Sequence, residues 1–166
     1  MSLNEINTAN TEDAYAVFES CCCAPKWIES MVSARPFADL DALLSKSEQA
    51  FSTLSDQDYL VAFTGHPQIG NLKTIHEKYA NTSGTASNEQ AGMSVADSEV
   101  LEEMIQLNQD YLKKFGFIFI VCASGKSAQE MLELIRNRIG NERSEELNIA
   151  GAEQAKITHI RLEKLL

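Results

Sequence analysis

The sequence lacks both a long hydrophobic run and an excess of basic residues. Of its 166 residues, 24 are acidic and 14 are basic, which gives a formal net charge of −10. Such a chain has no general basic surface to neutralise phosphates, so we expect neither a nucleic acid nor an anionic membrane as a partner. A local basic site for a small anion stays open. No apolar stretch approaches the roughly 20 residues that span a membrane.

Targeting signals are also lacking. Residues 1–13 are polar and acidic, without the positive region and apolar region of a signal peptide. The chain ends in RLEKLL and not in the peroxisomal Ser-Lys-Leu tripeptide. We therefore expect a cytoplasmic protein.

The four cysteines have no metal-binding spacing. Cys21, Cys22 and Cys23 are consecutive, and Cys122 is distant in the chain. Neighbours in one run do not form a disulfide framework, and no pair has the C-x-x-C spacing of a zinc site, so we expect no metal. Cys21 and Cys22 continue the helical spacing of Phe18, which predicts two buried apolar positions at the end of a helix.

Helical periodicity dominates the chain. Apolar residues recur every three or four positions. They predict helices over about 11–23, 25–34, 40–54, 55–65, 71–79, 100–116, 127–140 and 144–166. Residues 117–123, FIFIVCA, are seven apolar residues without a second strand to pair with, so a buried extended connector is as good an interpretation as a strand. The expected fold is all-α: one domain over residues 1–166, a helical bundle with a buried extended apolar connector.

A histidine lies between a glycine and a proline in FTGHPQIG, residues 63–70. Gly65 is expected to end a helix, and Pro67 pushes the backbone of His66 towards extended geometry. An imidazole that is held rigidly and titrates near neutrality suits acid–base catalysis. The alternative is a surface-loop histidine without a role, and His66 alone does not decide between the two.

Arg161 is predicted on the inward line of the last helix, one turn after Ile157. A buried guanidinium must be paired, either with an internal carboxylate or with a substrate carboxylate. Ser87, Glu89 and Gln90 lie in the glycine-bounded loop SNEQAG. That loop is either solvated or lines the same cleft as His66.

The segment ASGKS, residues 123–127, has some features of a phosphate-binding loop. A Walker A motif requires a glycine five residues before its second glycine, and Ile120 stands there. The phosphate-binding loop is therefore absent and we expect no nucleotide here, so we interpret the segment as a turn followed by the N-cap Ser127.

Taken together, five segments resemble the 2-oxo-4-hydroxy-4-carboxy-5-ureidoimidazoline (OHCU) decarboxylases of urate breakdown. They are WIESMVSARPF, HPQIG, NEQAG, LNQDYLKKFGFIFIVCASGKS and ITHIRL, in that family's order and spacing over about residues 20–162. The resemblance implies an all-helical, commonly homodimeric enzyme without cofactor or metal. Such an enzyme converts OHCU, a small ureidoimidazoline, to (S)-allantoin and CO2.

The resemblance also implies roles for particular residues. His66 corresponds to the central acid–base group, with Glu89 and Arg161 as the other catalytic residues. Substrate contacts are implied for the proline after the histidine, the loop around Glu89 and the backbone of the connector, namely Pro67, Ser87, Gln90, Phe119, Ile120, Val121, Cys122 and Ala123. The conjugated C=N and C=O groups of the substrate can accept the electrons, which explains why no cofactor is expected.

Two positions depart from the family's pattern. Ala86 stands where many members have a serine, with Ser87 one residue later, and Gln68 stands where many have arginine. Two alternatives therefore stay open. One is a non-catalytic all-α module that binds ureides or a partner protein, and the other is a decarboxylase of a related imidazoline carboxylate.

Overall fold

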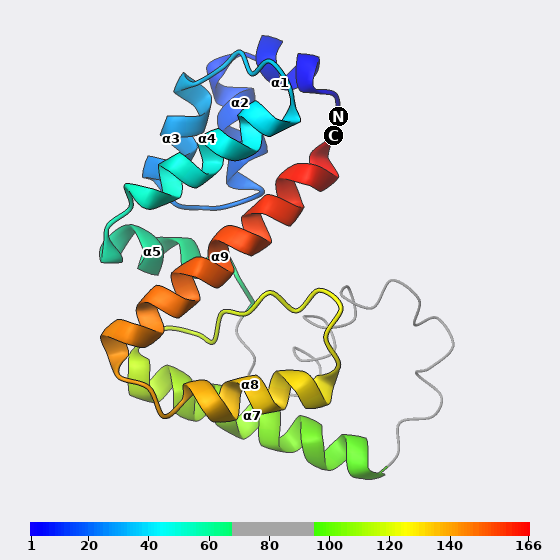
Figure 1. Cartoon of the computed structure of the whole chain (residues 1–166), viewed down its shortest axis with the longest axis vertical. Coiled ribbons are helices and arrows are strands. Elements are labelled where there is room, and N and C mark those ends of the chain that lie inside the picture. Colours follow the sequence, from blue (N-terminus) through cyan, green and yellow to red (C-terminus); the bar gives the residue numbers. More distant parts are fainter. Residues whose placement is uncertain (68–94) are drawn as a thin grey trace. The chain divides into compact units, whose positions relative to one another are not determined.

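The computed structural model describes residues 1–67 and 95–166, and all regular structure in this part of the chain is helical (Figure 1). The prediction of an all-α fold is confirmed. The chain divides into two compact units, residues 1–65 with 151–166 and residues 66–150. The helix predicted over 71–79 lies outside the described residues.

The first unit packs around an aromatic core. Its helices are α1 (Leu3–Thr8), α2 (Thr11–Glu19), α3 (Pro25–Ser33), α4 (Leu40–Ser52), α5 (Asp56–Phe63) and the C-terminal part of α9 (Arg143–Leu165). Trp27 is fully buried, with its ring centroid 6.0 Å from that of Phe18 and 5.7 Å from that of Phe51. Its indole N–H donates to the Ser47 hydroxyl over 3.2 Å, so the polar edge of this large side chain is also satisfied.

The helix predicted over residues 11–23 begins as expected at Thr11, but it ends at Glu19, four residues before the predicted end. A short helix that the sequence reasoning did not find, α1, precedes α2 and has a capping box of Ser2 and Glu5. Helix α2 ends at Glu19, and Ala24 is extended (φ −73°, ψ 112°) before Pro25, the first residue of α3. Cys21 and Cys22 are buried as predicted, but Cys21 lies in the turn after α2 and Cys22 follows that turn, so neither continues the helix.

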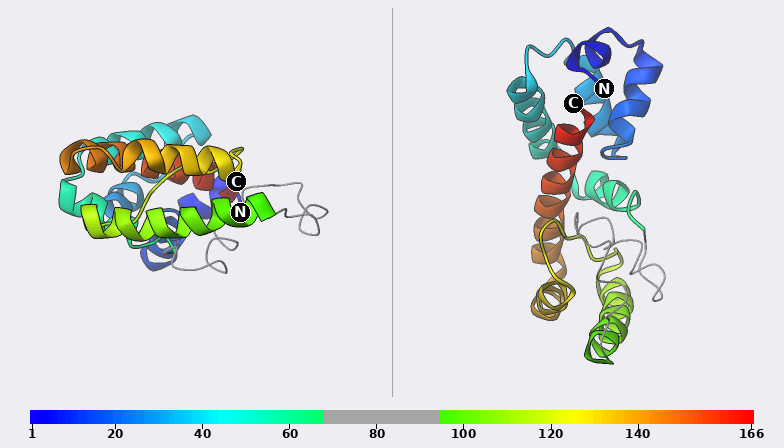
Figure 2. Two further views of the ribbon diagram at one scale, coloured as in Figure 1. Left: turned by 90° about the horizontal axis from the view of Figure 1, so that it is seen from below. Right: turned by 90° about the vertical axis from the view of Figure 1, so that its right-hand side faces the viewer.

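The second unit contains α7 (Val95–Phe115), α8 (Ala128–Arg138) and the start of α9. Helices α7 and α8 pack against each other (Figure 2). Gly116 ends α7 in the left-handed region, with φ +78°, as its position in the sequence predicts. Ser127 is the N-cap of α8, as predicted, and it forms a capping box with Glu130.

Residues 117–123, called the connector below, join α7 to the turn before α8 without forming a helix (Figure 1). Phe119 and Ile120 are fully buried. No strand occurs within residues 1–67 and 95–166, so the connector interpretation is confirmed over the strand. Gly125, at φ +74°, and the bond from the Lys126 N–H to the Ala123 carbonyl (3.1 Å) make ASGKS a turn, as predicted.

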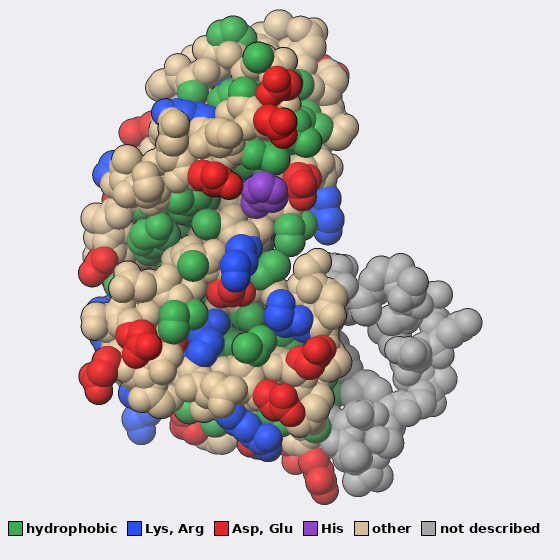
Figure 3. All heavy atoms as spheres, viewed as in Figure 1, with side chains coloured by type: hydrophobic (Ala, Val, Ile, Leu, Met, Phe, Trp, Pro, Cys, Tyr) green, Lys and Arg blue, Asp and Glu red, His purple; other side chains and the backbone are tan. Residues whose placement is uncertain are grey.

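The visible surface of the described residues combines charged, polar and hydrophobic side chains (Figure 3). Acidic and basic side chains are interspersed on the face shown in Figure 3. The only large hydrophobic residues exposed among the described ones are Met1 and Leu166. None of the helices in this part of the chain has the length and apolar character needed to cross a membrane.

Candidate active site

The segment before His66 is held by a cysteine. The Cys23 thiol donates to the Val61 carbonyl over 3.2 Å and lies 3.5 Å from the Ala62 carbonyl, so it caps the end of α5. Gly65 comes two residues after the last residue of α5, and a Cβ atom on it would lie 2.8 Å from the Cys23 sulfur. The glycine is thus needed for a close approach and not for a positive φ.

His66 itself is half-buried. Helix α5 has already ended at Phe63, two residues before the glycine that was predicted to end it. Pro67, which follows the histidine, is exposed. Thr64 and Gly65, which lead from α5 to the histidine, are exposed, and Gly65 lies against the Cys23 sulfur.

Arg161 lies beside the buried line of α9 and not on it. The buried residues in this part of the helix are Gln154, Thr158 and Leu162, whereas Arg161 is half-buried. The predicted inward position is therefore one residue off, because the buried face here advances in steps of four residues.

The guanidinium of Arg161 has a carbonyl partner. Its Nη1 donates to the Cys21 carbonyl over 2.9 Å. No carboxylate among the described residues forms an ion pair with it, so the internal-carboxylate alternative has no support there. An arginine has five N–H donors, and one bond to a carbonyl leaves the positive charge and further donors for an anion.

The two thiols near Arg161 do not neutralise its charge. Burial raises the pKa of Cys22 to about 11, and it also raises the pKa of Cys21, while the nearby Arg161 acts weakly in the opposite direction. Both side chains are therefore neutral thiols near pH 7. The charge of Arg161 is available to an anionic ligand.

The connector has an uneven pattern of backbone bonds. The Ile120 carbonyl accepts from Arg138 Nη1 and the Cys122 carbonyl accepts from Lys126 Nζ, each over 2.8 Å. Val121 between them is only 5% exposed, and its N–H and C=O have no hydrogen-bond partner among the described residues. Buried peptide groups are nearly always paired, so Val121 is a position where a ligand's amide or carbonyl groups fit.

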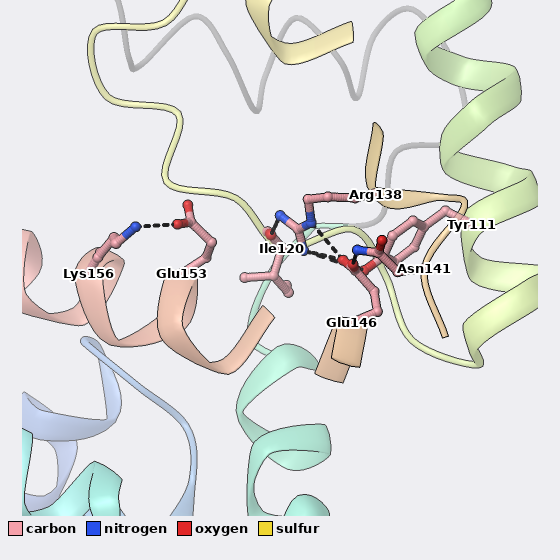
Figure 4. Close-up of polar contacts among 7 residues, drawn as sticks. All are labelled: Tyr111, Ile120, Arg138, Asn141, Glu146, Glu153 and Lys156. Atoms are coloured by element: carbon pink, nitrogen blue, oxygen red, sulfur yellow. Dashed lines mark hydrogen bonds and ion pairs between the residues drawn. The ribbon is translucent and has the colours of Figure 1, made fainter. Parts of the chain in front are cut away.

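A buried polar network that the sequence reasoning missed lies beneath the connector (Figure 4). The Glu146 carboxylate is fully buried and accepts hydrogen bonds from Tyr111, Arg138 and Asn141. One signal could have found it, since Glu146 adjoins the apolar Leu147 at the start of the last helix. Burial, followed by the hydrogen bond to Glu146, raises the pKa of Tyr111, so the phenol stays neutral and donates.

The described residues include only part of the predicted site. His66, Pro67 and the connector residues Phe119 to Ala123 belong to residues 66–150, and Arg161 belongs to the other unit. Ser87, Glu89 and Gln90 lie outside the described residues, as do the departures Ala86 and Gln68. In the described part, no group of three or more His, Cys, Asp or Glu side chains could hold a metal ion.

Comparison with known proteins gives a family match over almost the whole chain. The family model described as OHCU decarboxylase matches residues 7–163. The uric acid degradation bifunctional protein TTL of Arabidopsis thaliana is 36% identical over 156 residues, which cover 93% of this chain and 47% of that protein. The OHCU decarboxylase of Xenopus laevis is 28% identical over 98% of this chain and 93% of its own length.

Solved structures agree with this match. A crystal structure of OHCU decarboxylase in the presence of (S)-allantoin is 32% identical, with a TM-score of 0.72, over 95% of this chain and 98% of that one. An (S)-allantoin synthase structure, 14% identical with a TM-score of 0.69, shares the fold. Among curated relatives, this chain spans about half the length of the Arabidopsis protein and 32% of the bifunctional protein PucL of Bacillus subtilis.

Proposed function

The chain belongs to the OHCU decarboxylase family, and we propose that it converts OHCU to (S)-allantoin and CO2 in urate breakdown. The observation that carries this proposal is the family match over residues 7–163, which includes His66, Glu89 and Arg161. The OHCU decarboxylase structure with (S)-allantoin, which aligns over 95% of this chain, supports the same substrate and product.

The reaction needs an electron sink and a proton exchange. When the carboxylate leaves as CO2, its bonding electrons pass into the adjoining C=N group of the ring. The hydroxyl group then becomes the ring carbonyl of allantoin, and the ureido-bearing carbon receives a proton. One proton is consumed overall, and the substrate serves as its own electron sink, so the proposal includes no cofactor.

In our proposal Arg161 binds the anionic substrate. Its half-buried guanidinium is fixed at one nitrogen by the Cys21 carbonyl, which leaves other donors to orient a carboxylate. His66, coupled to Glu89, accepts the hydroxyl proton and assists the loss of CO2. One of these two groups then protonates the carbon from a single face, which sets the S configuration.

Substrate-binding contacts complete the proposed site. Pro67, Ser87 and Gln90 contact the ring and the ureido group, and so does the connector backbone from Phe119 to Ala123. The support within the described residues is Val121, whose buried peptide groups have no partner there.

The test uses circular dichroism of OHCU generated fresh from urate. Because OHCU also decays spontaneously to racemic allantoin, the decisive sign is rapid formation of optically active (S)-allantoin. We expect the His66→Ala variant to lose a factor of about 10²–10⁴ in kcat. The matched control is His159→Ala, which changes a histidine on α9 that pairs with Glu163.

Unchanged decay to racemic product in the presence of the protein would overturn the proposal and favour the non-catalytic binding module. Turnover by His66→Ala at the wild-type rate would instead overturn the role of His66 alone. A third result, turnover of a related imidazoline carboxylate but not of OHCU, would reassign the substrate.

We further propose that residues 1–166 fold as one cooperative domain and that the protein is a cytoplasmic homodimer. The family resemblance supports this assembly. Light scattering of the purified protein should give twice the mass of one chain, and calorimetry should give a single unfolding transition. A monomeric mass would contradict the first expectation, and two separate transitions would contradict the second.

A further inference from the structure

A buried ion pair joins α8 to α9 within residues 66–150. Arg138 Nε donates to a Glu146 carboxylate oxygen over 2.6 Å, and Nη2 pairs with the same oxygen. Arg138 is 7% exposed and Glu146 is not exposed at all. Apolar residues could join two helices with equal or greater stability, so such a costly pair calls for a further role.

The Glu146 carboxylate is fixed from several directions. The Tyr111 hydroxyl on α7 donates to one oxygen, and Asn141 Nδ2 donates to the other over 2.9 Å (Figure 4). With every neighbour in place, the carboxylate has one orientation. The Arg138 guanidinium, which is planar and bonded to it through two nitrogens, is then fixed as well.

The remaining edge of the guanidinium reaches the connector. Nη1 of Arg138 donates to the Ile120 carbonyl over 2.8 Å, as Figure 4 shows. The guanidinium carbon also lies 4.6 Å from the centroid of the Phe119 ring. Arg138 therefore fixes two successive connector residues to the ion pair.

This contact orients the peptide group that links Ile120 to Val121. Backbone polar groups of successive residues in an extended chain point to opposite sides. With the Ile120 carbonyl directed at Arg138, the N–H and C=O of Val121 are directed away from it. Those are the buried groups that have no partner among the described residues.

We propose that Arg138 is a positioning residue, which orients the connector so that the peptide groups of Val121 hydrogen-bond the ureido or ring amide groups of the substrate. Glu146 fixes the Arg138 guanidinium by accepting its hydrogen bond, and Tyr111 in turn fixes the Glu146 carboxylate. This inference rests on the proposed function, because it needs a ureide ligand on the connector.

The principal test is Arg138→Lys. A lysine keeps the positive charge that Glu146 requires, but its single ammonium group cannot hold the carboxylate and the Ile120 carbonyl in the same fixed fork. The control is Arg136→Lys in the same helix. Arg136 forms a comparable two-bond pair with Glu103, but both side chains are largely exposed.

Binding and turnover are measured separately. The Val121 amide signal of ¹⁵N-labelled protein is followed by NMR as (S)-allantoin is added, and KM and kcat are measured for OHCU. In wild type and in Arg136→Lys, we expect a saturable shift of the Val121 signal. In Arg138→Lys, we expect the Kd for (S)-allantoin and the KM to rise on the order of tenfold, with a smaller change in kcat.

Wild-type values of Kd and KM in a folded Arg138→Lys protein would overturn the proposal. If this variant does not fold, Arg138→Met with Glu146→Gln removes both buried charges together and is measured in its place, with the same expected rise. Failure of both variants to fold would assign the network to stability alone and also overturn the proposal.

The two proposals fail in different ways. Absence of OHCU turnover by the wild-type protein, with the Val121 shift on (S)-allantoin intact and lost in Arg138→Lys, would reject the decarboxylase activity and leave the positioning role standing. Turnover by wild type without any effect of (S)-allantoin on Val121 would support the decarboxylase activity and reject the positioning role of Arg138.

Discussion

The Cys23 sulfur lies 2.8 Å from the point where a Cβ atom on Gly65 would stand. Cys23 therefore lies directly against the residue before His66. From the sequence, Cys23 was known only as the last of three consecutive cysteines.

Replacing Gly65 by alanine should impair catalysis. The new methyl group must displace the Cys23 sulfur or the backbone by at least a few tenths of an ångström, which moves the residue that leads into His66. We expect kcat/KM for OHCU to fall about tenfold, since small misplacements of catalytic groups are costly. Adding Cys23→Ala should restore much of the loss, and Cys23→Ala alone is the control. Equal losses in the single and double variants would show that the cysteine contact is not the cause.

Arg161→Lys should weaken substrate binding. Lysine keeps the charge, but it cannot donate to the Cys21 carbonyl and form a planar two-bond contact with a carboxylate together. Loss of one charge-assisted bond predicts a fall in kcat/KM of roughly 10- to 100-fold. Steady-state kinetics on OHCU check this, with Lys164→Met, which changes an exposed cation on the same helix, as the control. Kinetics equal to those of wild type would remove Arg161 from the site.

Gly151→Ala should destabilise the protein, although alanine normally stabilises a helix interior relative to glycine. A Cβ atom at residue 151 would lie 2.9 Å from the Tyr59 ring, which is held by a 3.0 Å hydrogen bond from its hydroxyl to the Phe51 carbonyl. Overpacking of this kind lowers the free energy of unfolding by about 1–3 kcal/mol. Urea denaturation measures it. In a Tyr59→Leu background the same substitution should be neutral or stabilising, and an equal loss there would refute the steric explanation.

Stability should fall at alkaline pH. Burial raises the pKa of Cys22 from 9.0 to about 11 and also raises the pKa of Tyr111, so the folded state holds these protons more tightly than the unfolded state does. The stabilisation is complete below pH 9 and is lost as the pH rises through 11. For Cys22 it amounts to about 3 kcal/mol. Urea denaturation from pH 7 to 11 should show the decline, and Cys22→Ala should make it shallower between pH 9 and 11. An identical slope in that variant would contradict the assignment to Cys22.

Local sequence signals were enough to predict the structure wherever it depends on residues that are close together in the chain. Ser127 is the N-cap that the sequence predicts, and the capping boxes of Ser127 with Glu130 and of Ser55 with Asp58 each close over three residues. The interruption at residues 117–123 was also predictable, since Gly116 ends the preceding helix at φ +78°. The sequence reasoning missed α1, a helix of six residues that begins at the N-cap Ser2, and it placed the end of α2 four residues too late.

The sequence by itself determined the all-α fold, the connector and the identity of the residues proposed for the chemistry, because helical periodicity and motif order are properties of the chain. Only the tertiary structure decided how those residues are held. It paired Arg161 with the Cys21 carbonyl, placed Cys23 against Gly65, and joined Arg138, Glu146 and Tyr111 beneath Ile120. Each of these contacts joins residues 8 to 140 positions apart. Such pairs form only when packing removes water from both partners, and no local spacing rule encodes them.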